Sequence, residues 1–325
     1  MKSTAIAPSN IAFIKYWGRK NEELRLPENG SISMCLSDLT TTTTVEFDEK
    51  YTKDEITINN EKEEVAGSKA VKHLDRIRKL ANIEIKAKVV TNNNFPTGTG
   101  LSSSASGFAA LTVAASNAAS LHLSEKELSI LARQGSGSAC RSIPDGFVEW
   151  LDGDTSETSY AHSLYKPDYW NIADVVAVVS TGRKDVSTSA GQKLAASSPF
   201  FPVRKTHMKD KIKTCKELLV KKDFTHFGEL LELEALELHA IMLTSTPSLI
   251  YWTPGTLEIM KLVKKWRAEG LECYFAINTG QDIHVIVQEK HVDRLIKELK
   301  AVEQVKKIIV NHPSQGAHLI ANHLF

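Results

Sequence analysis

The chain has 325 residues, of which 42% are hydrophobic and 24% charged, and its formal net charge is +1. These values are ordinary for a globular protein, and the near balance of charge excludes a dedicated nucleic-acid surface, which needs a strong basic excess. The length exceeds the range over which one hydrophobic core keeps growing, so we expect two lobes, residues 1–170 and 171–325.

Cysteine spacing and apolar runs exclude further classes of protein. The four cysteines, Cys35, Cys140, Cys215 and Cys273, lie far apart and form no C-x-x-C pair. This excludes the common zinc spacings and indicates reduced thiols in a cytosol. No apolar run approaches about 18 residues, so we expect no membrane span, and the first residues are too polar for a signal peptide. We therefore expect a cytoplasmic protein with neither nucleic-acid nor membrane partners.

Hydrophobic periodicity and turn residues predict the elements of the first half. Alternating or β-branched runs predict strands, and apolar positions three or four residues apart predict helices. The elements expected up to residue 151 are a strand over 3–7 that ends at Pro8, a turn-and-strand passage over 24–34, a strand over 40–47, a hairpin at Asn59-Asn60, a helix over 69–80, a strand over 83–91, a helix over 108–119, a helix that starts at the capping box Ser124-x-x-Glu127, and a strand over 147–151.

Helical patterns become more frequent beyond residue 170. The elements expected there are a strand over 175–179, helices within 205–243 and 256–268, strands over 273–277 and 283–287, a helix over 292–299 and a strand over 307–310. Hairpins early and helices late predict an α+β architecture rather than a doubly wound parallel sheet. His239, on a helical face, is by itself more typical of a packed core residue than of a catalyst.

A Gly/Ser-rich stretch, residues 92–107, joins a predicted strand to a predicted helix. Gly98 and Gly100 permit positive φ and close backbone approach, and Ser102 to Ser104 lie where the helix should begin. Such a loop at a helix N-terminus is suited to binding an anion, most often phosphate. It matches neither the Walker A motif nor the dinucleotide fingerprint. The alternative is a plain Gly-Ser turn before a buried helix.

Two further segments carry cations that could meet an anionic substrate. Lys15, Arg19 and Lys20 end an apolar segment, and they are either a snorkelling lysine with a solvated turn or a converging set of anion ligands. Arg141 lies in a second Gly/Ser-rich loop, 135–146, where it could grip a carboxylate or phosphate with two hydrogen bonds. The alternative is an exposed loop arginine.

Several long motifs resemble the mevalonate diphosphate decarboxylase family of the GHMP-kinase superfamily. The resemblance runs in order from about residue 5 to about residue 290. The motifs that carry it are Ala7-Pro-Ser-Asn-Ile-Ala-Phe-Ile-Lys-Tyr-Trp-Gly-Arg-Lys20, Asn93-Asn-Phe-Pro-Thr97 with Gly100-Leu-Ser-Ser-Ser-Ala-Ser-Gly107, Gly135-Ser-Gly-Ser-Ala-Cys-Arg-Ser142 with Gly146-Phe-Val-Glu-Trp150, Lys184-Asp-Val-Ser-Thr188 and Ser198-Pro199.

The resemblance implies a GHMP-kinase fold with a left-handed βαβ unit in the N-terminal lobe, which binds ATP. It also implies a reaction in which ATP phosphorylates the tertiary 3-hydroxyl of a phosphorylated mevalonate. The 3-phosphate and CO2 then leave together, and an isopentenyl product remains. ATP and Mg²⁺ are the expected cofactors, the substrate is the expected small-molecule partner, and a homodimer is the expected assembly.

The resemblance also assigns residues to roles. The implied ATP ligands are Pro96, Gly98, Gly100, Ser102, Ser103 and Ser104, with Ser104 also assigned to the metal. The implied substrate ligands are Lys15, Tyr16, Arg19, Ser138 and Arg141, with Arg141 on the carboxylate and Arg19 where the family usually has lysine. The implied catalytic residues are Lys15, Arg141 and Asn278.

Asn278 departs from the family pattern, because the family has a catalytic aspartate at this position. An amide can hydrogen-bond the substrate hydroxyl but cannot accept its proton. Three accounts remain open. The hydroxyl is activated weakly, or by Asp282 or the substrate phosphate; or the chain is a deliberate Asp→Asn variant; or the phosphorylation half-reaction is lost. Asp282 lies too far along an extended strand for direct replacement unless the turn folds back.

The substrate and the class of activity also remain open. The passage from Leu24 to Ser33 and Tyr251-Trp-Thr-Pro254 resemble enzymes that use mevalonate 5-phosphate, whereas residues 15–20 resemble those that use the 5-diphosphate. We favour the monophosphate. Against the active decarboxylase stand a catalytically silent homologue, favoured only by Asn278, and a kinase that stops after phosphorylation.

Overall fold

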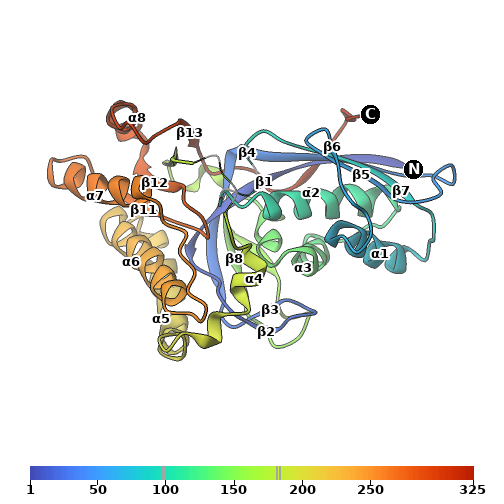
Figure 1. The fold of residues 1–325 in the computed structure, drawn as a ribbon, viewed down its shortest axis with the longest axis horizontal. Coiled ribbons are helices and arrows are strands. Elements are labelled where there is room, and N and C mark those ends of the chain that lie inside the picture. The colour runs from blue at the N-terminus through green and yellow to red at the C-terminus, as the bar shows by residue number, and fades with distance from the viewer. Residues whose placement is uncertain (97, 99, 181, 183) are drawn as a thin grey trace.

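The structure is a computed structural model that describes residues 1–96, 98, 100–180, 182 and 184–325. Two β-sheets, each covered by helices, lie side by side in it (Figure 1). Thr97, Thr99, Thr181 and Arg183 fall outside the description.

The larger sheet, as far as the described residues form it, has eight strands. Its main path runs in the order β14-β1-β4-β7-β5-β6, and β8 adds to β4 and then β9 to β8. The strands are β1 (Lys2–Ile14), β4 (Ser31–Phe47), β5 (Glu55–Ile58), β6 (Glu61–Lys62), β7 (Ala87–Asn93), β8 (Phe147–Trp150), β9 (Ala161–Tyr165) and β14 (His318–Ile320). Separately, β2 (Arg19–Asn21) and β3 (Leu26–Pro27) form a short hairpin.

Helices α1 (Lys69–Ala81), α2 (Ser103–Ala118) and α3 (Glu125–Gly135) lie together beside the larger sheet (Figure 1). Helix α2 is apolar on most of its surface and packs on β1 and β4, which explains its run of small residues. A short 3₁₀ helix, η1 (Gly137–Ser142), follows α3. Strands β5 and β7 are parallel and are connected through α1, whereas the other paired strands described here are antiparallel.

The smaller sheet is antiparallel in the order β11-β12-β10-β13. Its strands are β10 (Ile172–Val178), β11 (Cys273–Ala276), β12 (Ile283–Gln288) and β13 (Lys307–Asn311). The remaining helices are α4 (Thr188–Gln192), α5 (Phe201–Lys221), α6 (Phe224–Leu243), α7 (Pro254–Ala268) and α8 (Val292–Lys300), with short 3₁₀ turns η2 (Pro167–Tyr169), η3 (Ala195–Ser197) and η4 (Glu289–His291).

One hydrophobic cluster joins the two sheets. It includes Phe13 of β1 and Met34 of β4 from the larger sheet, Phe227 of α6, and Ile286 of β12 from the smaller sheet. Phe13 and Phe227 meet edge to face with ring centroids 4.9 Å apart. The end of β1 therefore lies against α6, and the residues that follow β1 emerge where the two sheets meet.

Most predicted elements are present, and the largest difference is in the first strand. Strand β1 does not end at Pro8 but continues to Ile14, with a shift of register between Pro8 and Asn10. A bulge of this kind tolerates proline, which cannot donate to the ladder. The hairpin turn at Asn59-Asn60 is confirmed, with both residues at positive φ, and so is the capping box at Ser124.

No helix in the described ranges combines the length and the apolar character needed to cross a membrane.

Candidate active site

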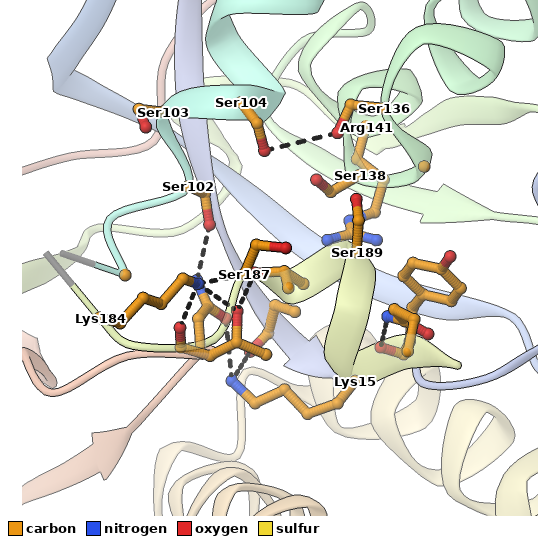
Figure 2. A pocket seen from close by; sticks show the side chains of 18 of the residues that line it. Lys15, Ser102, Ser103, Ser104, Ser136, Ser138, Arg141, Lys184, Ser187 and Ser189 are labelled. Atoms are coloured by element: carbon orange, nitrogen blue, oxygen red, sulfur yellow. Dashed lines mark hydrogen bonds between the residues drawn. The ribbon is translucent and has the colours of Figure 1, made fainter. Parts of the chain in front are cut away.

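A cavity of about 230 Å³ lies between the end of β1, the loop before α2, η1, α4 and the turn after β11 (Figure 2). It brings together nearly all the residues that the sequence assigned to the site. The assigned residues that line it are Lys15, Tyr16, Arg19, Gly98, Gly100, Ser102, Ser103, Ser104, Ser138, Arg141 and Asn278. Pro96 does not line it and is half-buried two residues before Gly98. Lys20 lies outside it and pairs with Asp154 at 2.6 Å.

The cavity is strongly cationic. Its described lining includes Lys15, Arg19, Lys69, Arg141 and Lys184, and no aspartate or glutamate. Such a concentration of like charge in a chain of net charge +1 is local. It indicates a site for a ligand, or a pair of ligands, that carries several negative charges.

The loop before α2 has the features of a phosphate site. Ser102 adopts a left-handed conformation with φ 58°, and its hydroxyl does not cap the helix. The three serine side chains are arranged around the first turn of α2 (Figure 2). Gly100 has φ +117°, and a Cβ there would lie 2.6 Å from the Cα of Gly280. Thr97 and Thr99, which belong to the predicted phosphate loop, lie outside the described residues.

Arg141 is buried, and its guanidinium is only partly satisfied by the protein. Nη1 donates to Ser31 Oγ at 3.0 Å and Nη2 to Asn10 Oδ1 at 3.1 Å, whereas Nε has no hydrogen-bond partner. The described residues place no carboxylate in ion-pair contact with it. A buried cation held only by neutral groups is suited to an anionic ligand, because an unpaired buried charge is costly.

Tyr16 and Arg19 form one corner of the cavity. Arg19 Nε donates to the Tyr16 hydroxyl at 2.7 Å, and Arg19 Nη1 donates to Glu22 at 2.7 Å. Burial raises the pKa of Tyr16, and its ring packs against Trp150 with centroids 4.6 Å apart. The phenol therefore stays protonated and can donate to a ligand oxygen.

Lys15 follows β1 directly and is 2% exposed. Its Nζ donates to the carbonyl oxygen of Ala12 at 2.7 Å and lies 3.4 Å from Asn278 Oδ1. Burial lowers the pKa of Lys15 from 10.5 to about 7, and the nearby Glu234 offsets only part of that effect. The snorkelling alternative is wrong, because the amine points into the protein.

Asn278 lies on the turn after β11, and its amide has a defined orientation. Nδ2 donates to Ser102 Oγ at 3.1 Å and to the carbonyl oxygen of Asn10 at 3.4 Å, while Oδ1 faces Lys15. His239 Nε2 donates to the main-chain oxygen of Asn278 at 3.0 Å. Burial lowers the pKa of His239 to about 3, so this neutral histidine positions the turn.

Asp282 does not take the place of a carboxylate at position 278. It lies outside the cavity lining, and its Oδ1 accepts hydrogen bonds from the main-chain N–H groups of Val179 at 3.0 Å and Ser180 at 3.4 Å. The turn does not fold back in the way that replacement requires. The account in which Asp282 activates the hydroxyl is therefore not supported by its position.

A second cavity, of about 380 Å³, shares Ser103 and Ser104 with the first. Its other walls are more apolar and include Ile56, Val89 and Phe108. The two cavities thus meet at the N-terminus of α2, one cationic and the other partly apolar.

No group of three or more His, Cys, Asp or Glu side chains that could hold a metal ion occurs among the described residues. A divalent cation at this site would therefore take most of its ligands from phosphate oxygens and water, as Mg²⁺ commonly does. The hydroxyls of Ser102 to Ser104 are compatible with that arrangement.

Two family models match the chain. The diphosphomevalonate decarboxylase-like N-terminal domain matches residues 7–161, and the mevalonate 5-diphosphate decarboxylase C-terminal domain matches residues 174–320. The chain belongs to the diphosphomevalonate decarboxylase family.

Individual relatives agree with this membership. A diphosphomevalonate decarboxylase of Candida albicans is 34% identical over 315 residues, which cover 91% of this chain and 87% of the relative. A phosphomevalonate decarboxylase of Haloferax volcanii is 33% identical over 297 residues, 91% of each. A solved structure described as "MDDEF in complex with MVAPP, AMPPCP and Magnesium" superposes with a TM-score of 0.93 at 36% identity, over 99% of both chains. The predicted family and the mixed α+β fold are confirmed.

Within this decarboxylase-family chain, sequence reasoning did not assign several residues of the cavity. Lys184 Nζ donates to the main-chain oxygen of Thr279 at 2.6 Å and to Thr188 Oγ1 at 2.7 Å, and Lys184 N donates to Gly98 O at 3.2 Å. The motif 184–188 carried part of the resemblance and could have indicated this lysine. Nothing in the local pattern of α1 distinguished Lys69, which reaches Ser189 at 3.4 Å.

Proposed function

We propose that the protein catalyses the ATP-dependent decarboxylation of a mevalonate phosphorylated on its 5-hydroxyl, giving the corresponding isopentenyl phosphate. The observation that carries the proposal is the placement of the partly satisfied Arg141 guanidinium across one cationic cavity from the Ser102–Ser104 loop. A carboxylate and a phosphate donor can thus be held on either side of the same substrate carbon.

The proposed chemistry proceeds in two steps. The 3-hydroxyl oxygen attacks the γ-phosphorus of ATP, and the bond from this phosphorus to the β,γ-bridging oxygen breaks, so that ADP leaves. The C3–O bond then breaks with loss of phosphate, while the electrons of the C1–C2 bond form the C2–C3 double bond and CO2 is released. Positive charge develops at C3 in this second step, and Arg141 and the surrounding cations favour departure of the anion.

The nucleotide is proposed to span both cavities. Its phosphates lie against Ser102 to Ser104 and Lys184, and its base and ribose occupy the second cavity. We also propose Pro96 and Gly98 as ATP ligands, because they belong to the same loop as Ser102 to Ser104. Mg²⁺ would be held with Ser104 as its proposed protein ligand, and it would neutralise charge that develops on the phosphates during phosphoryl transfer.

The nucleotide placement can be tested by filling the second cavity. Ala70 lines it, so Ala70→Phe should weaken ATP binding by about tenfold or more, because a new ring displaces the base. Lys72→Phe adds the same ring at an exposed position of α1 and is the control. Equal affinity of the two variants in titration calorimetry with a non-hydrolysable ATP analogue would contradict the placement.

The substrate is tested directly with the purified protein, ATP, MgCl2 and either mevalonate 5-phosphate or mevalonate 5-diphosphate. We propose the monophosphate as the better substrate, and the named relatives include enzymes of both kinds. Release of CO2 and ADP is followed for the wild type and for Asn278→Asp. CO2 release from neither substrate by either protein would reject the decarboxylase.

A catalytically silent homologue is the second candidate, and Asn278 is the feature that favours it. In that case only Asn278→Asp would release CO2. A kinase that stops after phosphorylation would instead release ADP and accumulate a 3-phosphorylated product without CO2.

Three further expectations stay proposals. We propose that the crossover from β5 through α1 to the parallel strand β7 is left-handed, that the protein is a homodimer and that it is cytoplasmic. An experimental structure tests the first, sedimentation equilibrium the second, and fractionation of cells the third.

A further inference from the structure

The amine of Lys15 is buried, and no carboxylate among the described residues is in ion-pair contact with it. Its two partners are the main-chain oxygen of Ala12, at 2.7 Å, and the amide oxygen of Asn278, at 3.4 Å. Both partners are uncharged, so neither supplies the opposite charge that a buried ammonium ion requires. A neutral amine has two N–H donors and one lone pair. In the neutral form the two oxygens can satisfy both donors, and one position on the nitrogen is left for the lone pair at a residue that lines the cavity.

From this geometry we propose, on the basis of the proposed function, that neutral Lys15 is the proton acceptor for the 3-hydroxyl of the substrate and so does the work of the family's aspartate.

The charged groups around Lys15 do not reverse this state. Glu234 of α6 accepts from the Lys15 main-chain N–H at 2.9 Å, but it is also paired with Arg204 of α5 at 2.9 Å and Lys211 at 2.8 Å. Its charge is therefore largely balanced elsewhere. Arg204 itself, like Arg141 of η1, opposes a charge on Lys15.

The remaining titratable neighbours of Lys15 are hydrogen-bonded to other groups. Asp174 of β10 is hydrogen-bonded to His284 at 2.9 Å. His239 of α6 donates to the Asn278 main chain and is neutral. With burial as the largest effect, the pKa of Lys15 falls to about 7, within the range of a useful general base.

Asn278 is the residue that permits this role. An aspartate at position 278 would put a carboxylate where Oδ1 lies, 3.4 Å from the amine. The amine would then hold its proton as one half of an ion pair, and the carboxylate would become the acceptor. With asparagine at position 278 the cavity lacks the carboxylate base, and Lys15 has no carboxylate there that would keep it protonated.

The proton balance closes over one turnover. The hydroxyl proton moves to Lys15 Nζ as O3 bonds to the γ-phosphorus, which gives an ammonium ion beside the new 3-phosphate. When the C3–O bond breaks, the ammonium returns that proton to the departing phosphate. Lys15 is then neutral again, and no further reactant is required.

The protonation state is tested without turnover. Protein labelled with ¹³C-lysine is titrated by NMR, and the Lys15 Cε signal is assigned by its absence in Lys15→Met. We expect a midpoint near pH 7 in the wild type and an upward shift of about 1–3 units in Asn278→Asp, as an opposite charge nearby produces. A wild-type Lys15 that remains protonated to pH 9 overturns the inference, whatever the activity.

The catalytic role is tested by the rate of ADP formation in single turnovers. The wild-type rate should fall about tenfold per pH unit below the NMR midpoint, whereas Asn278→Asp should keep its rate to lower pH. Lys15→Met should lose about 10²–10⁴-fold, the usual worth of general base catalysis, and adding Asn278→Asp should restore much of it.

Lys184→Met is the matched control, because Lys184 is a second cationic residue of the same cavity. Its loss should not be restored by Asn278→Asp. Rescue of both lysine variants, or of neither, would overturn the assignment of Lys15 as the base. Absence of CO2 release from both substrates, with any of these proteins, would instead reject the proposed function, and the base assignment would fall with it.

Discussion

Arg141 and Lys15 are both buried basic side chains, but their surroundings favour different protonation states. A guanidinium remains protonated when it is buried, so Arg141 keeps a charge that neutral Ser31 and Asn10 only partly solvate. An amine can instead release its proton. Lys15 faces oxygen acceptors and no adjacent carboxylate among the described residues. The cavity thus combines a fixed positive charge with a group able to change its charge.

We expect Arg141→Ala to abolish detectable CO2 release while ATP binding changes little. Loss of one partner of a buried charge pair costs about 2–5 kcal/mol, so the substrate carboxylate would bind at least about 30-fold more weakly. CO2 release and nucleotide affinity are measured on the same preparation. Lys20→Ala, outside the cavity, is the control. Equal loss of ATP binding would mean that Arg141 contacts the nucleotide.

Lys15 also predicts how stability depends on pH. Its pKa is about 7 when folded and 10.5 ordinarily, so between these values the unfolded chain binds one more proton. The free energy of unfolding should therefore rise with pH in this window, by about 1.4 kcal/mol per unit for the single proton. Below pH 7 Lys15 is protonated in both the folded and the unfolded state, so the folded state bears the full free-energy cost of burying the charge.

Lys15→Met should remove this contribution and be more stable than the wild type at pH 7. Urea denaturation at several pH values measures the difference between the two proteins. A constant difference from pH 7 to 10 would show that Lys15 is charged in the folded state.

At the scale of elements, the loop before α2 and the turn after β11 are held together by close backbone packing. Gly100 and Gly280 approach so closely that a side chain on Gly100 would displace one of them, and Lys184 binds both segments. The position of Asn278 is therefore set partly by the loop before α2.

Gly100→Ala should lower the rate of phosphoryl transfer and weaken ATP binding without unfolding the protein. Both effects follow from the added Cβ, which would lie 2.6 Å from Gly280 Cα. Gly67→Ala is a matched control, because Gly67 also has positive φ, +72°, but nothing lies within 4 Å of its added Cβ. It should cost about 1–2 kcal/mol of stability and leave activity unchanged. Similar activity of both variants would contradict the role of the contact.

Sequence patterns predicted many elements because apolar periodicity and caps are local. Helix α1, the Asn59-Asn60 turn and the capping box at Ser124 depend on neighbouring residues, and each is present. The length of β1 was not predicted, since Pro8 is accommodated by a shift of pairing with β4. Strand β14 depends on a partner about 315 residues away, which no local pattern records.

The site was predicted through motifs that carry chemistry, and residues outside such motifs were missed. Arg141 and Ser102 to Ser104 stood out as an arginine and serines in Gly-rich loops. Lys69 is one of several lysines on an ordinary amphipathic helix, and only tertiary packing brings it to the cavity. The state of Lys15 likewise depends on burial and on the orientation of one amide.

At the scale of the whole molecule, the two sheets share their central hydrophobic cluster. The proposed division into residues 1–170 and 171–325 is crossed by Phe13–Phe227 packing and by β14, which belongs to the larger sheet. If either half folded alone, much of this hydrophobic cluster would be exposed to water.

We therefore expect one cooperative unfolding transition. Transitions followed by far-UV circular dichroism and by tryptophan fluorescence should coincide, because a shared core unfolds as a unit. A fragment of residues 1–170 should fail to give a native-like spectrum. Two separated transitions would contradict this expectation and show that the sheets are stabilised independently.

The position of β14 has a consequence for how the chain acquires its structure during synthesis. Strand β1 can pair with β4 early in synthesis, because β4 follows it closely, but its other edge is covered by β14, about 315 residues later. The hydroxyl of Thr4 in β1 likewise gains its hydrogen bond to His323 Nδ1, at 2.7 Å, only after His323 has been synthesised. This edge of β1 can therefore close only once residues 318–320 have been synthesised, and until then β1 is open to pairing with other nascent chains.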